Sequence, residues 1–289
     1  MCIRDSIILF LLTCFSTFIA GALHWNPSSY LGGDGIELRR SLLVNWEQGL
    51  VYMGTVLAIL LCHEMGHFLA AKRHGVPASY PFFIPFPISP IGTMGAVIGM
   101  AGNRADRRQL FDIGIAGPLA GLVVAIPVLW FGIKQLDPSA APAGLFELDC
   151  PYIVRLLLPF ARPELPNIDR IALTQTNAMF IAAWVGLLIT GLNMMPISQL
   201  DGGHVIYTLF LKRGHIIARI FLFCAITYAV LGNGGMWSVM IILVILMGTD
   251  HPPTANDHQP LGWFRTALGF ASLAIPILCF PARGFLWTI

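Results

Sequence analysis

Long apolar stretches cover most of this chain, and they constrain its fold more than any other feature. A transmembrane helix needs about 20 mostly apolar residues. Only 11% of the 289 residues are Asp, Glu, Lys or Arg, against about 25% in a typical soluble domain. This composition excludes a disordered chain, a nucleic-acid-binding protein and an ordinary soluble enzyme. We therefore predict an all-α polytopic membrane protein with about seven transmembrane helices, at 6–24, 48–70, 111–133, 176–196, 216–232, 236–249 and 266–281.

The distribution of charge predicts the orientation of these spans. Basic residues gather in the segments that follow the second and fourth spans, whereas the stretch 135–175 mixes acidic and basic residues. Because cytoplasmic loops are enriched in Lys and Arg, we expect the basic segments in the cytoplasm. The stretch 135–175 is too short for a separate domain, although it has room for a brief amphipathic helix. We therefore expect one integral membrane domain over 1–289, with an extra N-terminal span at 6–24, a core at 48–212 and additional spans in 216–289.

The segment 80–100 interrupts the helical pattern. It is apolar but contains Pro81, Pro85, Pro87 and Pro90, so no continuous helix passes through it. An irregular segment or small β-hairpin that dips into the membrane fits this composition, because non-helical backbone survives at membrane depth where it is buried or lines a cavity. Two interpretations stay open. The edge of the segment pairs with an extended peptide, or the segment is an interfacial loop that packs over the core.

Three ionisable residues lie inside the second predicted span. His63, Glu64 and His67 form an H-E-x-x-H pattern, and unpaired ionisable groups in a span cost several kcal/mol. On a helix, positions i and i+4 share a face, so both imidazoles can reach one metal ion. Glu64 is offset by one residue, where it can take a proton from a metal-bound water without being a ligand. Zinc suits ligands of this kind. A transporter that uses these charges to carry ions is an alternative from another functional class.

A third ligand is expected near the end of the fourth predicted span. Pro196 breaks the helix there, and Gly202 and Gly203 let the backbone turn directly after Asp201. The carboxylate of Asp201 then sits at a broken helix end, at the depth of the two histidines. Two alternatives stay open at this point: Asp201 is a helix cap, or the nearby His204 is the ligand instead.

Other residues of the third and fourth predicted spans allow two interpretations each. Asn193 could hold a substrate carbonyl or the oxyanion formed on attack, or it could make a hydrogen bond between helices. Gly117 and Gly121 form a G-x-x-x-G pattern, for which we favour close helix packing. We expect Asp112 to cap the N-terminus of the third span rather than to bind a metal.

These motifs together carry a family resemblance. HEMGH on one span, followed by N-x-x-P-x-x-x-L-D-G-G on a later one, resembles the site-2 protease family of intramembrane zinc metalloproteases. The sequence GIAGPLAGL at 114–122 is similar to the small-residue central helix of that family. The segment 80–100 and the H-P-P at 251–253 resemble the branch that lacks a PDZ domain.

The resemblance implies a set of roles for this chain. His63, His67 and Asp201 would bind one zinc ion, Glu64 would act as general base, and Asn193 would line the substrate cleft. The domain over 1–289 would then be a membrane peptidase. It would cleave membrane-spanning protein substrates within or near the lipid bilayer, often after a first cut by an upstream site-1-type protease, and it would need no nucleic acid.

The resemblance also bears on location and on rival interpretations. We expect a bacterial inner membrane, with the active site toward the cytoplasm, and a plastid membrane is the alternative. Another kind of membrane zinc protease would take its third ligand from Glu147 or Glu164, but both lie in the stretch expected outside. A catalytically dead relative that acts as a binding module is disfavoured, because the H-E-x-x-H pattern is intact.

Overall fold

The computed structural model describes residues 3–25, 35–143, 146–165, 168–197, 199–232 and 234–287. It is mostly helical. Within these residues, four helices are long and apolar enough to cross a membrane, namely Arg4–Ala22, Trp46–Arg73, Arg107–Lys134 and Asp201–Leu231. The apolar helices Tyr152–Ala161, Ala178–Asn193, Gly235–Leu246 and Trp263–Cys279 are shorter. A total of about seven spans therefore stays a prediction.

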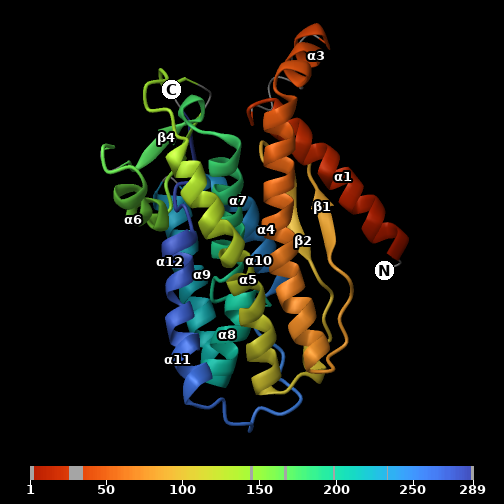
Figure 1. The fold of residues 1–289 in the computed structure, drawn as a ribbon. Coiled ribbons are helices and arrows are strands. Elements are labelled where there is room, and N and C mark those ends of the chain that lie inside the picture. Colours follow the sequence, from red (N-terminus) through yellow and green to blue (C-terminus); the bar gives the residue numbers. More distant parts are fainter. Residues whose placement is uncertain are drawn as a thin grey trace.

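The long helices stand side by side, and shorter helices complete the bundle (Figure 1). Helices α4 and α5 pack against each other and both pack against α7, while α1 covers the side of the molecule that carries β1. The helices are α1 Ile3–Ala22, α3 Gly35–Val44, α4 Trp46–Arg73, α5 Arg107–Lys134, α6 Tyr152–Ala161, α7 Ala178–Asn193, α8 Asp201–Phe210, α9 Gly214–Leu231, α10 Ser238–Met247, α11 Trp263–Ser272 and α12 Ala274–Cys279. Short 3-10 turns lie at Gly102–Arg104, Leu173–Gln175, Leu211–Arg213 and Gly234–Trp237.

Helix α5 begins at a capping box that the sequence analysis missed. The side chain of Asp106 accepts hydrogen bonds from the backbone N–H groups of Arg108 and Gln109, and the Gln109 side chain accepts one from the N–H of Asp106. Such a box satisfies the unpaired donors of the first turn. The expectation that Asp112 caps this helix is therefore wrong. Asp112 lies six residues after Asp106, where it accepts two hydrogen bonds from Arg265, at 2.7 and 2.9 Å.

Two short strands occupy the proline-rich segment. Strand β1 (Phe82–Pro85) pairs antiparallel with β2 (Thr93–Val97), with Phe83 opposite Ala96 and an irregularity before Pro85. The turn between them is fixed at Gly92, whose φ of +76° favours glycine and whose carbonyl accepts a hydrogen bond of 2.7 Å from Ser16 of α1. This pairing places β2 beside α4 (Figure 1). Insertion of the segment into a membrane stays a prediction.

The stretch 135–175 holds more structure than the short helix expected there. Helix α6 supplies that helix, and β3 (Phe146–Asp149) lies in the middle of a three-stranded antiparallel sheet of order β4-β3-β5. The outer strands are β4 (Arg170–Ala172) and β5 (Phe285–Trp287). The indole N–H of Trp184 on α7 donates to the main-chain oxygen of Asp149 at 2.7 Å, so the sheet is attached to the helical core.

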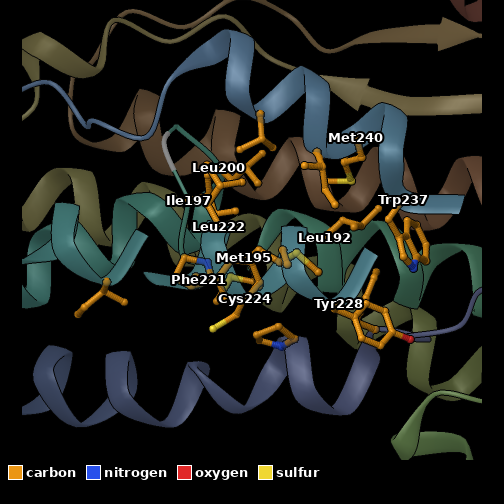
Figure 2. A pocket seen from close by; sticks show the side chains of 18 of the residues that line it. Leu192, Met195, Ile197, Leu200, Phe221, Leu222, Cys224, Tyr228, Trp237 and Met240 are labelled. Atoms are coloured by element: carbon orange, nitrogen blue, oxygen red, sulfur yellow. The ribbon is translucent and has the colours of Figure 1, made fainter. Parts of the chain in front are cut away.

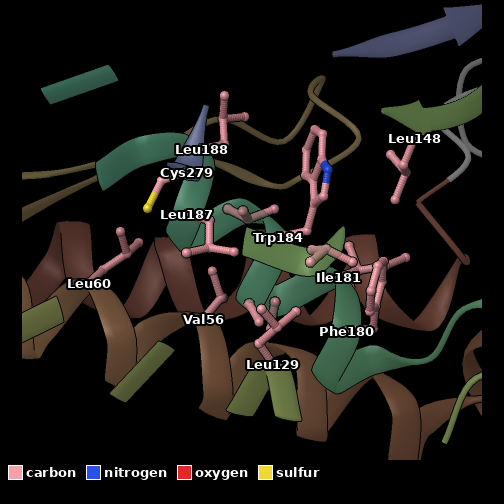
Figure 3. Close-up of a cluster of buried hydrophobic side chains, with 14 of the residues drawn as sticks. Val56, Leu60, Leu129, Leu148, Phe180, Ile181, Trp184, Leu187, Leu188 and Cys279 are labelled. Atoms are coloured by element: carbon pink, nitrogen blue, oxygen red, sulfur yellow. The ribbon is translucent and has the colours of Figure 1, made fainter. Parts of the chain in front are cut away.

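The core lies where α4, α5 and α7 meet (Figure 3). Helix α7 is buried on nearly all sides, as its uniformly apolar sequence requires. Phe180 and Trp184 of this helix are both 0% exposed, and they pack among Val56 of α4 and Leu129 of α5. This packing fixes α4, which carries His63 and His67, against α5 and α7.

Replacing Trp184 with Ala should lower the free energy of unfolding by about 3–5 kcal/mol, because a large buried side chain leaves a cavity. The variant also loses the hydrogen bond to Asp149. Thermal and denaturant unfolding of the purified protein in detergent would measure the change. Trp263→Ala is the matched control, because Trp263 is 83% exposed, and an equal loss in both variants would contradict the packing described here.

Candidate metal centre

Two histidines and an aspartate from distant parts of the chain meet inside the helical bundle. Nε2 of His63 and Nε2 of His67, on α4, lie 3.1 and 3.2 Å from Oδ2 of Asp201, the first residue of α8. One donor atom from each residue lies within 4.8 Å of the others. The histidines are buried and the aspartate side chain is 14% exposed. These are the three residues that the sequence predicted as ligands.

The hydrogen bond made by Nδ1 of His67 shows which ring nitrogen carries the proton. Nδ1 lies 2.8 Å from the main-chain oxygen of Ile113, which can only accept, so Nδ1 donates and Nε2 of the neutral ring carries a lone pair. That lone pair faces Oδ2 of Asp201, and a carboxylate oxygen also presents lone pairs. Two lone pairs at this distance repel each other unless a proton or a metal ion lies between them. The residues therefore fit a bound cation.

The spacing of the donor atoms is compatible with zinc. Ligand atoms at about 2.0–2.2 Å from a tetrahedral zinc ion lie roughly 3.3–3.6 Å from each other. The two contacts to Asp201, at 3.1 and 3.2 Å, come close to this spacing. Two imidazoles and one carboxylate leave a fourth position open for water, which is the pattern of catalytic rather than structural zinc sites.

Small residues on α5 make room for the histidines. A Cβ atom added to Gly117 would lie 2.0 Å from Nε2 of His67, and one added to Gly121 would lie 3.1 Å from Nδ1 of His63. Gly114, one turn earlier, is similarly close to His204, at 3.0 Å from its Cβ. The G-x-x-x-G pattern thus serves close packing, as expected, and the groups packed against it are the imidazole rings.

The break between α7 and α8 positions the aspartate. Helix α7 ends at Asn193, and α8 begins at Asp201 after a turn that includes Pro196. A Cβ atom on Gly202 would lie 2.1 Å from the main-chain oxygen of Met194, so only glycine allows the two helix ends to come this close. Leu200 occupies the N-cap position without a side-chain hydrogen bond. The Asp201 carboxylate therefore contacts the histidines and is not the helix cap.

The glutamates of the rival interpretation lie elsewhere. Glu147 on β3 forms an ion pair with Arg170 on β4 at 3.8 Å. Glu164 pairs with Arg162. Neither glutamate belongs to the group of side chains that could hold a metal ion among the described residues.

A polar cavity of about 660 Å³ is lined by two of the three candidate ligands, His67 and Asp201. Glu64 lines it and is 5% exposed, next to His67 on α4. Asn193 lines the same cavity from the end of α7, and no hydrogen bond to its side chain is found within the described residues. The backbone from Ala96 to Met100, which continues from β2, forms another part of the wall. Catalytic and substrate-binding candidates thus share one cavity with the metal centre.

The sequence analysis missed one histidine of this cavity. His251, in the segment that follows α10, lines it together with His204 of α8, and Nδ1 of His204 lies 2.6 Å from Nε2 of His251. His204 therefore faces another histidine and stands outside the group of three donors. The H-P-P motif that begins at His251 was the available signal, but its position in the sequence does not reveal what it contacts.

A second cavity, of about 530 Å³, is lined almost entirely by apolar side chains from α9, α10, α12 and the turn between α7 and α8 (Figure 2). Leu200 lines both this apolar cavity and the polar cavity. The turn that positions Asp201 therefore also separates a polar chamber from an apolar one.

Apolar helices that bury two histidines and an aspartate beside a glutamate are typical of membrane-bound metalloproteases. The sequence model described as peptidase family M50 matches residues 51–229, which are more than half of the chain and include all four of these side chains. The chain belongs to peptidase family M50, the site-2 protease family.

Several plant proteins are similar to this chain. The protein described as "Probable zinc metalloprotease EGY1, chloroplastic" from Oryza sativa subsp. japonica is 31% identical over 293 residues, which cover 94% of this chain and 49% of that protein. Its Arabidopsis thaliana counterpart is 31% identical over 236 residues, which cover 78% and 42%. The chain thus spans at most about half the length of these curated relatives. No solved structure matches it significantly.

Replacing Gly117 with Ala should weaken zinc binding by about tenfold or more, because the added methyl group would overlap the His67 ring and displace its nitrogen. Zinc content after dialysis against a chelator series, measured by elemental analysis, would report the loss. Gly54→Ala is the matched control, since an added Cβ there meets nothing within 4 Å. Equal zinc retention in both variants would show that α5 does not set the position of His67.

Proposed function

We propose that this protein is an intramembrane zinc metalloprotease that hydrolyses peptide bonds of membrane-spanning proteins within or near the bilayer. The observation that carries this proposal is the meeting of His63, His67 and Asp201, in which a lone pair of the neutral His67 ring faces a carboxylate, an arrangement that a shared metal ion stabilises. Membership of peptidase family M50 supports the peptidase chemistry. The long apolar helices support a membrane setting.

In this proposal one zinc ion is bound by His63, His67 and Asp201. When bound, zinc lowers the pKa of a coordinated water to about 7 and polarises a peptide carbonyl. The hydrogen bond from His67 to the Ile113 carbonyl orients the ring toward the ion, and such supporting contacts raise the basicity of a metal-binding histidine.

Glu64 handles the proton. Its side chain is buried beside His67 and lines the polar cavity, so it can reach a water that approaches the metal centre from that cavity. As general base it accepts the proton of the attacking water. As general acid it then gives this proton to the leaving amine, which restores the carboxylate for the next cycle.

The remaining wall of the cavity binds the substrate in this proposal. The Asn193 amide, half-buried at the end of α7, donates a hydrogen bond to a substrate carbonyl or to the oxyanion formed on attack. A helical substrate must unwind first, because its carbonyls are otherwise bonded within the helix. The segment 96–100, which consists of the last two residues of β2 and the three that follow, offers an edge on which the unwound segment can lie as an added strand.

The compartment and the partners belong to the same proposal. A bacterial inner membrane with the active site toward the cytoplasm agrees with the charge distribution. The chloroplastic relatives favour a plastid membrane instead. A site-1-type protease that makes the first cut would act upstream. The partners of the cleavage itself are a transmembrane protein substrate and the surrounding lipid.

Glu64→Gln should retain zinc and lose cleavage by at least about 100-fold, because the amide cannot accept the proton of the attacking water. A proteomic comparison of membranes from cells that produce the wild type or the variant would identify single-span proteins left uncut, and elemental analysis would report zinc. Glu47→Gln is the matched control at the exposed start of α4. The same cleaved fragments in the presence of Glu64→Gln would remove the glutamate from this role.

Val97→Asp should reduce cleavage by about tenfold while leaving zinc content unchanged, because a charge on the cavity wall disfavours an apolar substrate strand. Met94→Asp is the matched control. Both residues are exposed on β2, at 40% for Val97 and 59% for Met94, but only Val97 lines the polar cavity. Similar activities of the two variants would mean that this wall does not touch the substrate.

A further inference from the structure

Two linked hydrogen bonds show which ring nitrogens carry the protons in the histidine pair His204 and His251, at the edge of the polar cavity. Nδ1 of His251 lies 2.6 Å from the main-chain oxygen of Pro252. A carbonyl oxygen can only accept, so Nδ1 of His251 donates, and Nε2 of the neutral ring carries a lone pair. Nδ1 of His204 lies 2.6 Å from that Nε2 and must therefore donate to it. In consequence, the proton of the His204 ring is on Nδ1, and its Nε2 is an acceptor.

The surroundings of His251 hold it in this role. Its ring stacks on Tyr207 of α8, with ring centroids 4.4 Å apart and planes at 20°. The Tyr207 hydroxyl donates to Asp257 at 2.8 Å, and the N–H of Ala255 donates to the carbonyl of Ala105 at 2.9 Å, so the segment carrying the histidine is attached at both α8 and the start of α5. Burial lowers the pKa of His251 below its ordinary value, which keeps the ring neutral at pH 7.

Within the part of the chain that the structure describes, no hydrogen bond to Nε2 of His204 is found, so this acceptor can bind a ligand. The base of the His204 ring packs against Gly114 of α5, and the ring lines the polar cavity with Glu64 and Asn193. Within the described residues, His251 is the hydrogen-bond partner found for this ring, and it takes Nδ1. In the proposed function, Glu64 contacts the attacking water and Asn193 contacts the carbonyl of the peptide unit. Nε2 of His204 is a hydrogen-bond acceptor and therefore suits a peptide N–H instead.

We propose that His251 is a positioning residue that holds His204 in the Nδ1-protonated form, so that Nε2 of His204 accepts a hydrogen bond from a backbone N–H of the peptide bound in the polar cavity. This inference rests on the proposed function, because it takes a peptide as the occupant. It assigns the histidine after the D-G-G sequence to substrate binding rather than to the metal. It also predicts selectivity against proline at the contacted substrate position, because proline has no N–H.

The first test reads the proton positions directly. In purified protein labelled with ¹⁵N-histidine, Nε2 of His204 should give an unprotonated-type resonance and Nδ1 a protonated-type one, assigned by their loss in His204→Gln. In His251→Phe, which keeps an aromatic ring on Tyr207 but loses the acceptor, the Nε2 signal should move toward the protonated type. A protonated Nε2 in the wild type would overturn the proposal, whatever the enzymatic activity.

The second test reads binding. In a Glu64→Gln background, which prevents turnover, fluorescently labelled β-casein serves as an unfolded peptide chain, and anisotropy in detergent gives its Kd. His251→Phe should raise the Kd about 3- to 10-fold, the range expected for one hydrogen bond. His251→Gln, whose amide oxygen can replace the acceptor, should restore it. His215→Gln is the matched control, because His215 contacts Tyr207 but does not line the cavity.

The outcomes separate this inference from the proposed function. Loss of zinc in His204→Gln would make His204 a metal ligand and overturn the inference, while the zinc protease proposal would stand. An unchanged Kd in His251→Phe would overturn it as well. Conversely, the expected resonances and Kd values in a protein that cleaves no membrane protein would leave the histidine pair in place as a peptide-binding device and contradict the proposed protease activity.

Discussion

The carboxylate of Asp201 lies beside two imidazole nitrogens in the interior of an apolar helical bundle, and this contact imposes conditions on everything around it. In the His67 ring, the other nitrogen (Nδ1) donates to the main-chain oxygen of Ile113, so Nε2 of the neutral ring and Oδ2 of Asp201 present lone pairs to each other. In surroundings of low polarity such an arrangement is costly unless a cation is shared. In the proposed function, one bound metal ion would remove this repulsion and also supply the chemistry of the site.

Close approach of backbones is how the bundle meets these conditions. Three glycines on one face of α5 lie against His63, His67 and His204, and Gly202 lets the end of α7 touch the start of α8. Away from these glycines, the large apolar side chains of α7 pack against α4 and α5. Large apolar side chains thus fill the core, and glycines leave room for the imidazole rings.

The parts of the site governed by local geometry were predictable from the sequence. The spacing of His63 and His67 fixes them on one helix face, and the broken helix before Asp201 can be read from proline and glycine. Contacts between distant segments were not predictable in this way. The partner of His204 lies 47 residues away, and the strands β3 and β5 come from opposite ends of the second half of the chain. The choice of Asp106 over Asp112 as cap depends on a shift of six residues in where α5 begins.

The pairing of β5 with β3 has a consequence for how the molecule is made. Strand β3 precedes α7 through α12 in the chain, and β5 follows them, yet the two strands are hydrogen-bonded neighbours. Synthesis proceeds at about 5–20 residues per second. The edge of β3 that pairs with β5 therefore has no partner until every later helix has been synthesised. For that interval this edge of β3 is unpaired, and an unpaired strand edge can pair with other chains.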